Sequence, residues 1–170
     1  KLEEIANELA KQPKYRGEIS SKMLLHLPTA ASLHDIGKIA VPDKILNNRQ
    51  ALNDDEYEIM KKHTLWGADI LEELTFFPKI SYGAKYHHER YDGKGYPSGI
   101  EGESIPLVAR IIAVADAYDA MTSKRCYRNI LSHDKVRSEI ENGSGHQFNP
   151  DFAQVMLDII TEDTEYLLHE

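Results

Sequence analysis

The stretch Ser32-Leu33-His34-Asp35-Ile36-Gly37-Lys38 sets an imidazole beside a carboxylate, with a lysine three residues after the aspartate. Imidazole nitrogens and carboxylate oxygens are common ligands of divalent metals. Adjacent helical residues point about 100° apart, so both side chains can reach one ion only at a helix end. Pro28 suits the first turn of such a helix, and Gly37 suits its end. Alone, the pair is better explained by a capping or hydrogen-bonded interaction than by a metal.

Three further histidines and one aspartate strengthen the metal interpretation. His63, His87 and His88 fall on inward faces or at ends of predicted helices. Asp116 follows the apolar run Ile111–Ala115, and a carboxylate buried there costs several kcal/mol unless it is paired or binds a cation. Asp119 lies one helical turn further along the same face.

Each of these residues also has an ordinary explanation. His63 could be a core histidine with its hydrogen bonds satisfied, and His87–His88 could be a solvated helix end. Asp116 could form an ion pair with Arg110 or Arg125. The remaining histidines have no comparable setting, and we expect them at the surface: His26, His133, His146 and His169.

Taken together, the residues predict a centre built from imidazole and carboxylate ligands. Such a set suits iron, manganese, zinc, nickel or cobalt. Six ligands exceed the needs of one four-coordinate ion, so two metals that share Asp35 as a bridge are the economical interpretation. Two adjacent metals can activate water and stabilise charge on phosphoryl oxygens, which indicates attack at phosphorus. The candidate ligands are His34, Asp35, His63, His87, His88 and Asp116.

The elements that must position these ligands are predicted to be helices. Asn53 and Glu56 have capping-box spacing, Pro106 precedes the most apolar segment, and Asn149-Pro150 opens the last helix. The stretch Glu89–Ile105 is rich in glycine and charge, so we expect a functional loop and not a strand pair. The fold class is therefore all-α. Apolar periodicity predicts helices over 2–11, 19–27, 28–33, 53–74, 78–88, 107–121 and 132–141, with 39–51 as a connection.

The composition is that of an ordinary globular domain. Of 170 residues, 41 % are hydrophobic and 28 % charged, and the formal net charge is −8. That charge argues against a nonspecific nucleic-acid binder. The single cysteine, Cys126, suits a reducing compartment. With no signal peptide or membrane-spanning apolar run in the sequence, we expect a cytoplasmic location.

Several longer motifs resemble those of HD-GYP domains, the branch of the HD phosphohydrolases linked to bacterial cyclic-dinucleotide signalling. The resemblance covers nearly the whole chain. The motifs are 34–38 (His-Asp-Ile-Gly-Lys), 87–89 (His-His-Glu), 92–97 (Asp-Gly-Lys-Gly-Tyr-Pro) and the run 109–122.

The resemblance implies a compact all-α HD bundle with two or three divalent metals, most often iron or manganese, on the six candidate ligands. It implies that Lys38 meets the scissile phosphate and that Asp119 lies beside the attacking water or the leaving group. Substrate contacts are implied for Gly95, Tyr96, Pro97, Arg125 and Arg128.

The activity implied by the resemblance is hydrolysis of cyclic di-GMP to linear pGpG, GMP or both. The same chemistry on cyclic GMP-AMP is an alternative, because no residue in these motifs reads the base. A non-catalytic cyclic-dinucleotide receptor is the other alternative, but such a receptor has no need of the complete ligand set or of Lys38. The implied partners are diguanylate cyclase (GGDEF) domains at the GYP loop and an N-terminal sensory or receiver domain.

Two features depart from the family pattern. Members with three metals take a Glu and a His from the preceding helix, but Lys1–Leu9 offers no such His, and we expect Glu3, Glu4 and Glu8 on a solvated face. Cys126 stands where proline is more common. Because no cap precedes Leu2, we expect residues 1–170 to form one HD-GYP domain of a longer protein that begins before Lys1.

Overall fold

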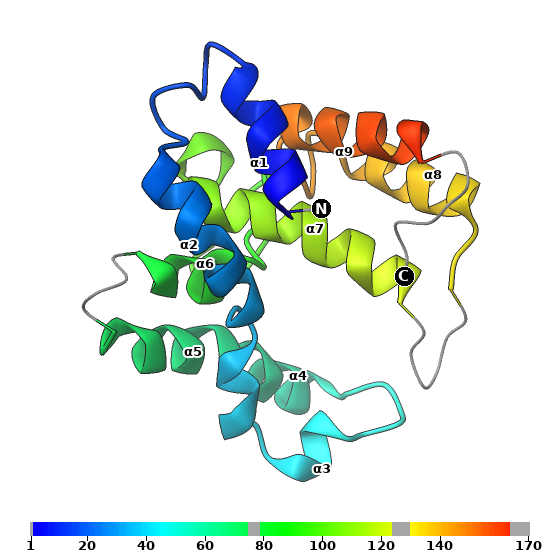
Figure 1. Cartoon of the computed structure of the whole chain (residues 1–170). Helices are drawn as coiled ribbons and strands as arrows, with labels where there is room; N and C mark the ends of the chain where they lie inside the picture. The colour runs from blue at the N-terminus through cyan, green and yellow to red at the C-terminus, as the bar shows by residue number, and fades with distance from the viewer. Residues whose placement is uncertain (1, 75–78, 124–129, 164–170) are drawn as a thin grey trace.

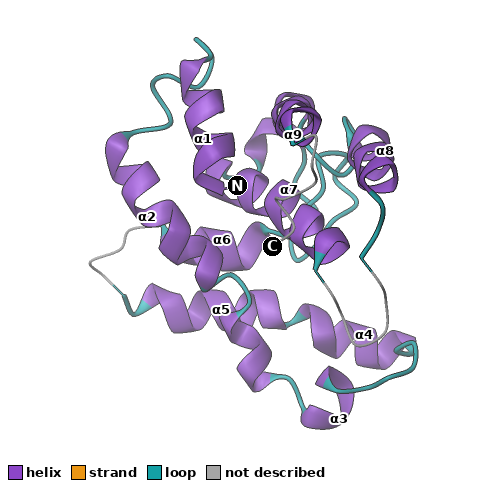
Figure 2. Ribbon diagram, turned by 45° about the vertical axis from the view of Figure 1, so that its right-hand side comes forward, coloured by secondary structure: helices purple, strands orange, loops and turns teal. Residues whose placement is uncertain are grey.

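The computed structural model describes residues 2–74, 79–123 and 130–163. Every secondary-structure element named within these ranges is a helix (Figure 1, Figure 2). The all-α prediction is confirmed. No described helix has both the length and the apolar character needed to cross a bilayer. In chain order the elements are α1 (Leu2–Lys11), α2 (Ser21–Ser32), the 3₁₀ helix η1 (Ile36–Ala40), α3 (Asp43–Leu46), α4 (Asp54–Lys61), α5 (His63–Glu72), α6 (Ile80–Tyr86), the 3₁₀ helix η2 (Gly102–Ser104), α7 (Leu107–Thr122), α8 (His133–Gly143) and α9 (Pro150–Glu162).

The apolar helix α7 lies at the centre, with α1, α2, α6, α8 and α9 packed around it (Figure 1). Its neighbouring residues Ile111 and Ile112 are both fully buried but belong to different hydrophobic clusters. Ile111 joins the larger cluster with α1, α8 and α9, and Ile112 joins the smaller one with α2, α5 and α6. Because α7 is apolar nearly all round, a single helix can serve both clusters.

A polar network connects the start of α7 with η2, with the segment after α1 and with the start of α9. The buried guanidinium of Arg110 pairs with Glu103 of η2, and the amide of Asn149 donates to the same carboxylate at 3.0 Å. Lys14 bridges Glu103 at 3.1 Å and Asp151 at 2.8 Å. These contacts fix η2 against α9 and the segment after α1.

The contact between η1 and α5 depends on two glycines. A Cβ added to Gly37 would lie 1.9 Å from the carbonyl oxygen of His63 and 2.4 Å from the backbone nitrogen of Gly67. Gly67 has a less restricted environment, because the nearest atom to its own hypothetical Cβ, Gly37 N, is 3.1 Å away. Only glycine at position 37 lets the backbone of η1 rest directly on α5. This approach brings the segment after His34-Asp35 next to His63.

Some predicted helix boundaries are wrong. Pro28 does not separate two helices: it lies inside α2, which runs without interruption from Ser21 to Ser32. Leu27 and Ala30, on either side of the proline, are both buried. Their packing offsets the local cost of about 3 kcal/mol for an interior proline.

The predicted helix over 53–74 is in fact two helices that meet at Lys62. Its start is correct, because Asn53 and Glu56 form the expected capping box. The predicted connection over 39–51 contains the short helix α3, which is anchored by buried Ile45. Ser132 does stand at the start of α8, although its side chain makes no capping hydrogen bond.

Replacement of Gly37 by Ala should destabilise the fold by about 3 kcal/mol, because the new methyl group would collide with backbone atoms that cannot move aside. Thermal unfolding followed by circular dichroism measures the change. The matched control is Gly17→Ala, since a Cβ at Gly17 meets nothing within 4 Å, and its effect should stay within about 1 kcal/mol. Equal stability of the two variants would contradict the packing argument.

Candidate metal centre

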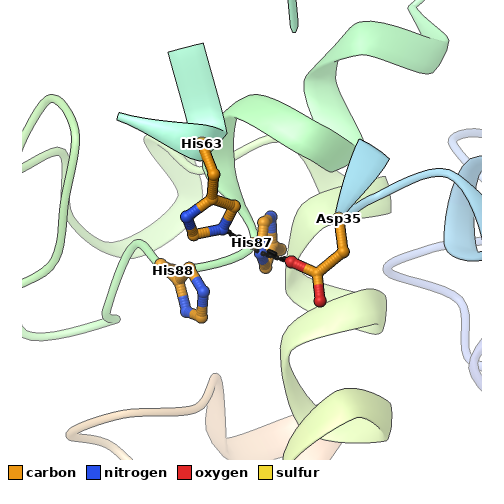
Figure 3. Close-up of side chains that lie close together, drawn as sticks. All are labelled: Asp35, His63, His87 and His88. Atoms are coloured by element: carbon orange, nitrogen blue, oxygen red, sulfur yellow. Dashed lines mark hydrogen bonds and ion pairs between the residues drawn. The ribbon is translucent and has the colours of Figure 1, made fainter. Parts of the chain in front are cut away.

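Asp35 lies in the turn between α2 and η1, and its two carboxylate oxygens face different histidines. Oδ1 is 3.4 Å from Nε2 of His63 and 3.7 Å from Nε2 of His87. Oδ2 is 3.5 Å from Nε2 of His34. In Figure 3 the side chains of Asp35, His63, His87 and His88 converge from separate segments on one point. One ligand atom from each of these four residues lies within 4.8 Å of the others.

The three histidines around Asp35 are oriented by one repeated local contact. In each, Nδ1 bonds to the backbone carbonyl three residues earlier, at a helix end or helix start. A carbonyl can only accept, so Nδ1 carries the proton and Nε2 presents a lone pair. The pairs are His34 with Ala31 at 2.5 Å, His63 with Met60 at 2.7 Å, and His87 with Ala84 at 2.8 Å.

Apart from the Lys38 ammonium, which bonds to Oδ2 of Asp35, the atoms that converge at this centre are acceptors. Nε2 of His63 lies only 3.5 Å from Nε2 of His87, although both nitrogens are left unprotonated by their Nδ1 contacts. Among the described residues, Nε2 of His34 and Oδ1 of Asp35 are buried with no hydrogen bond. Converging lone pairs of this kind are unfavourable unless a cation lies between them. The residues present thus fit a divalent metal, because carboxylate oxygens and imidazole nitrogens are common ligands of such ions.

Burial acts to lower the pKa of His34, but contacts with Asp116 and Asp35 raise it above its ordinary value. For His87 and His88, burial prevails and keeps the rings in the ligand form. It lowers the pKa of His87 to about 3 and that of His88 to about 4, with like-charged histidine neighbours acting in the same direction. Both rings are consequently neutral near pH 7. Burial opposes the ionisation of Asp35, but the Lys38 ammonium bonded to Oδ2 holds the pKa of this carboxyl below its ordinary value.

A cavity of about 420 Å³ continues from His34 along α7, past Asp116 and Asp119. Oδ1 of Asp116 lies 3.6 Å from Nε2 of His34, the same nitrogen that faces Oδ2 of Asp35. The side chain of Asp116 is 32 % exposed, so it borders the cavity and is not deeply buried as the apolar run suggested. Leu2 and Glu3 of α1 complete the lining. Glu3 is exposed as expected, yet it faces the same cavity as the aspartates.

This geometry argues against the ordinary explanations given above for His63, for the His87–His88 doublet and for an Asp116–Arg110 ion pair. Arg110 pairs with Glu103 and not with Asp116. His87 is only 3 % exposed, so the doublet is not a solvated helix end. His63 is buried, but its Nε2 points at Asp35. Of the histidines expected at the surface, His146 is exposed, His26 and His133 are half-buried, and His169 lies outside the described residues.

The glycine-rich stretch is folded tightly against the histidine doublet. The ring of Tyr96 lies 4.8 Å from that of His88, inclined by 31°. A Cβ at Gly95 would lie 2.6 Å from the His88 carbonyl oxygen and 2.3 Å from Arg90 N. Glycine at 95 is thus required by the chain's own backbone, a reason separate from the substrate contact that the family resemblance implied for this residue. The peptide bond between Tyr96 and Pro97 is cis.

Glu89 fastens this loop, a role that the motif alone does not reveal. Its side chain is buried, and its Oε1 accepts a 2.6 Å hydrogen bond from the Ser98 amide. Burial raises the pKa of Glu89 above its ordinary value, while the amides of Ser98, Gly99 and Ile100 act in the opposite direction. The sequence offered one signal for this role: Glu89 directly follows two candidate metal ligands and precedes a glycine-rich loop.

Sequence reasoning also missed Tyr57 and Lys61 of α4, which both contact Tyr96. The capping box predicted the helix, but it did not indicate that side chains of the helix contact Tyr96. Arg125 and Arg128, predicted to bind phosphate, lie outside the described residues, as does Cys126.

Comparison with known proteins identifies the class. The profile of the HD domain family matches residues 1–152, and the chain belongs to this family. It is 38 % identical over 160 residues to a cyclic di-GMP phosphodiesterase of Vibrio cholerae, covering 90 % of this chain and 32 % of that protein. It is 36 % identical over 134 residues to 3′3′-cGAMP-specific phosphodiesterase 2 of the same organism, covering 78 % and 26 %.

A solved structure shares the fold. The HD-GYP protein Bd1817 of Bdellovibrio bacteriovorus superposes with a TM-score of 0.69 over 94 % of this chain and 50 % of that one, at 19 % identity. The resemblance to HD-GYP domains drawn from the motifs is confirmed. The chain spans about a third or less of the length of the two curated relatives.

Replacement of Glu89 by Ala should loosen the loop, because the amides of residues 98–100 lose their buried acceptor at a cost of about 1–3 kcal/mol. Hydrogen exchange of those amides should accelerate, while exchange in α9 stays unchanged. Glu101→Ala, which removes an exposed carboxylate from the same loop, is the control. Unchanged exchange at residues 98–100 in Glu89→Ala would show that the clamp is dispensable.

Proposed function

We propose that this domain is a metal-dependent phosphodiesterase that opens cyclic di-GMP to linear pGpG, to GMP, or to both. The observation that carries the proposal is the arrangement around Asp35. Its two oxygens face separate unprotonated imidazole nitrogens, and among the described residues Oδ1 of Asp35 and Nε2 of His34 are buried without a hydrogen-bond partner. The named activities of relatives at 36–38 % identity support the substrate class.

The ligand assignment follows the two sides of Asp35. Oδ1 faces His63 and His87, which form a cluster with His88, and Oδ2 faces His34, which in turn faces Asp116. We propose two divalent ions at these positions, with Asp35 shared between them and iron or manganese as the metal. Bound there, the ions would acidify a water molecule and neutralise charge on the phosphodiester oxygens.

The remaining residues orient substrate and move protons. Lys38 is held beside Asp35 and is 40 % exposed, so its ammonium is available to a phosphate oxygen or the leaving oxygen. Asp119 is exposed at the cavity wall, where its carboxylate can exchange a proton with water or a sugar oxygen. Tyr96, with Gly95 and Pro97, forms one side of the substrate groove beside His88.

Two finer assignments rest on the motifs. We propose that Arg125 and Arg128 hold the phosphates of the dinucleotide, which bidentate arginine contacts would explain. We also propose that the GYP loop docks diguanylate cyclase domains. The Glu89 clamp supports such a role, because a loop of fixed shape loses less entropy on binding.

Cyclic GMP-AMP is a second candidate substrate, favoured by the 36 % identity to a cGAMP-specific relative. Parallel turnover assays on cyclic di-GMP and 3′3′-cGAMP with iron or manganese would separate the two. Failure to hydrolyse either compound would overturn the proposed activity and favour a receptor.

Replacement of Asp35 by Ala should remove both bound metal and turnover, since both groups of nitrogens lose their shared carboxylate. Elemental analysis of the purified protein and a cyclic di-GMP assay measure the two effects. Asp43→Ala, on the exposed face of α3, is the control and should retain both. Full metal content with a normal rate in Asp35→Ala would refute the bridging assignment.

Replacement of Lys38 by Ala should retain the metal but slow turnover by about 10²-fold, the scale for a lost acid or electrostatic group. Metal content and kcat are measured on the same preparation. Lys44→Ala, which removes an exposed cation from α3, is the matched control. Metal loss in Lys38→Ala would make the role of Lys38 structural.

A further inference from the structure

Tyr57 and Lys61 of α4 form a continuous surface with Tyr96 at the edge of the metal cluster. The ring of Tyr57 lies 6.4 Å from that of Tyr96 in an edge-to-face arrangement of 80°. Nζ of Lys61 lies 5.4 Å from the ring centre of Tyr57 and 5.8 Å from that of Tyr96. Because Tyr96 contacts His88, this aromatic wall (Tyr57, Lys61, Tyr96) begins at the metal ligands and runs outward.

Core packing does not explain the position of these two side chains. None of the eight residues of α4 is buried, and Tyr57 itself is 48 % exposed. The helix is instead stabilised locally by the Asn53–Glu56 capping box. A helix with no fully buried residue that directs an aromatic ring and a cation toward Tyr96 is placed for contact with a ligand.

The chemistry of the wall suits a nucleotide. Exposed aromatic rings stack on bases, and a neighbouring lysine attracts the phosphate. Lys61 pairs at 2.5 Å with Glu58, which is 65 % exposed. Such an exposed pair contributes little, so a phosphate can replace Glu58 as the partner.

We propose that Tyr57 and Lys61, together with Tyr96, form a subsite for one guanine base of the cyclic dinucleotide and the phosphate beside it. The proposal rests on the proposed phosphodiesterase function and adds the part of the substrate that α4 recognises. In this arrangement the scissile phosphate lies at the Asp35 cluster, and the base extends along Tyr96 to Tyr57.

The aromatic contribution is tested on the metal-loaded domain. Tyr57→Ala should raise KM for cyclic di-GMP by about tenfold with little change in kcat, the scale of one base–aromatic stack. Tyr57→Phe should restore KM, because stacking needs the ring and not the hydroxyl. Tyr82→Ala, which removes a tyrosine of 38 % exposure from α6, is the control, and circular dichroism confirms that each variant is folded.

The contribution of Lys61 has its own signature. Lys61→Ala should raise KM and reduce its dependence on salt concentration, because one charge contact to phosphate is lost. Lys61→Arg should restore both. Lys11→Ala is a close control, since Lys11 forms the same i,i+3 pair with Glu8 at 2.5 Å at the end of α1.

A second substrate separates this proposal from the one it rests on. Bis(p-nitrophenyl) phosphate has a phosphodiester but no purine, so the ratio of KM for cyclic di-GMP to KM for this ester should rise in Tyr57→Ala. Wild-type KM for cyclic di-GMP in Tyr57→Ala would overturn the subsite while leaving the phosphodiesterase intact. Equal loss on both substrates would also overturn it and make α4 a support for the metal cluster. A wild-type domain inactive on both substrates would refute the proposed function itself.

Discussion

The direct backbone contact between Gly37 and Gly67 is the constraint on which the candidate centre depends. A Cβ at Gly37 would collide with the His63 carbonyl and with Gly67, so η1 and α5 could not lie this close with any other residue there. Asp35 precedes Gly37 by two residues, and His63 begins α5. The distance of 3.4 Å between their ligand atoms is therefore set by a contact that itself contains no metal ligand. Interiors are packed too densely for the neighbouring backbone to yield.

The second requirement is that the ligands be rigid before a metal binds. The three contacts from Nδ1 to carbonyls three residues earlier fix both the ring orientation and the tautomer. The carbonyls come from helix ends, where orphan acceptors are available. Helix ends thus hold these imidazoles in a fixed orientation, and α7 links this region to the larger hydrophobic cluster through Ile111.

The glycine-rich loop and α4, which lie beside the candidate metal ligands, are stabilised differently, by local hydrogen bonds. Glu89 clamps the loop through backbone amides, and Gly95 packs on the chain that follows His88. Beside this loop, α4 relies on its capping box. The candidate ligands are therefore held by helix packing and helix ends, whereas these neighbouring segments are held by local contacts.

The sequence by itself determined the all-α class, the family and the candidate ligands. Helical periodicity, caps at Asn53 and Asn149, and the motifs around His34-Asp35 and His87-His88 are local signals that a chain carries without knowledge of its fold. Boundaries were less secure: Pro28 was predicted to break a helix, but burial of Leu27 and Ala30 keeps α2 intact.

Only the tertiary structure decided how the ligands divide around Asp35, that Arg110 belongs to Glu103, and that Tyr57 and Lys61 face Tyr96. These contacts join segments far apart in the chain, and no periodicity encodes them. They depend on the angle at which helices cross, which close approach at residues such as Gly37 and Gly67 fixes. A sequence can list the donors of a metal site, but the packing of the helices decides which of them share an ion.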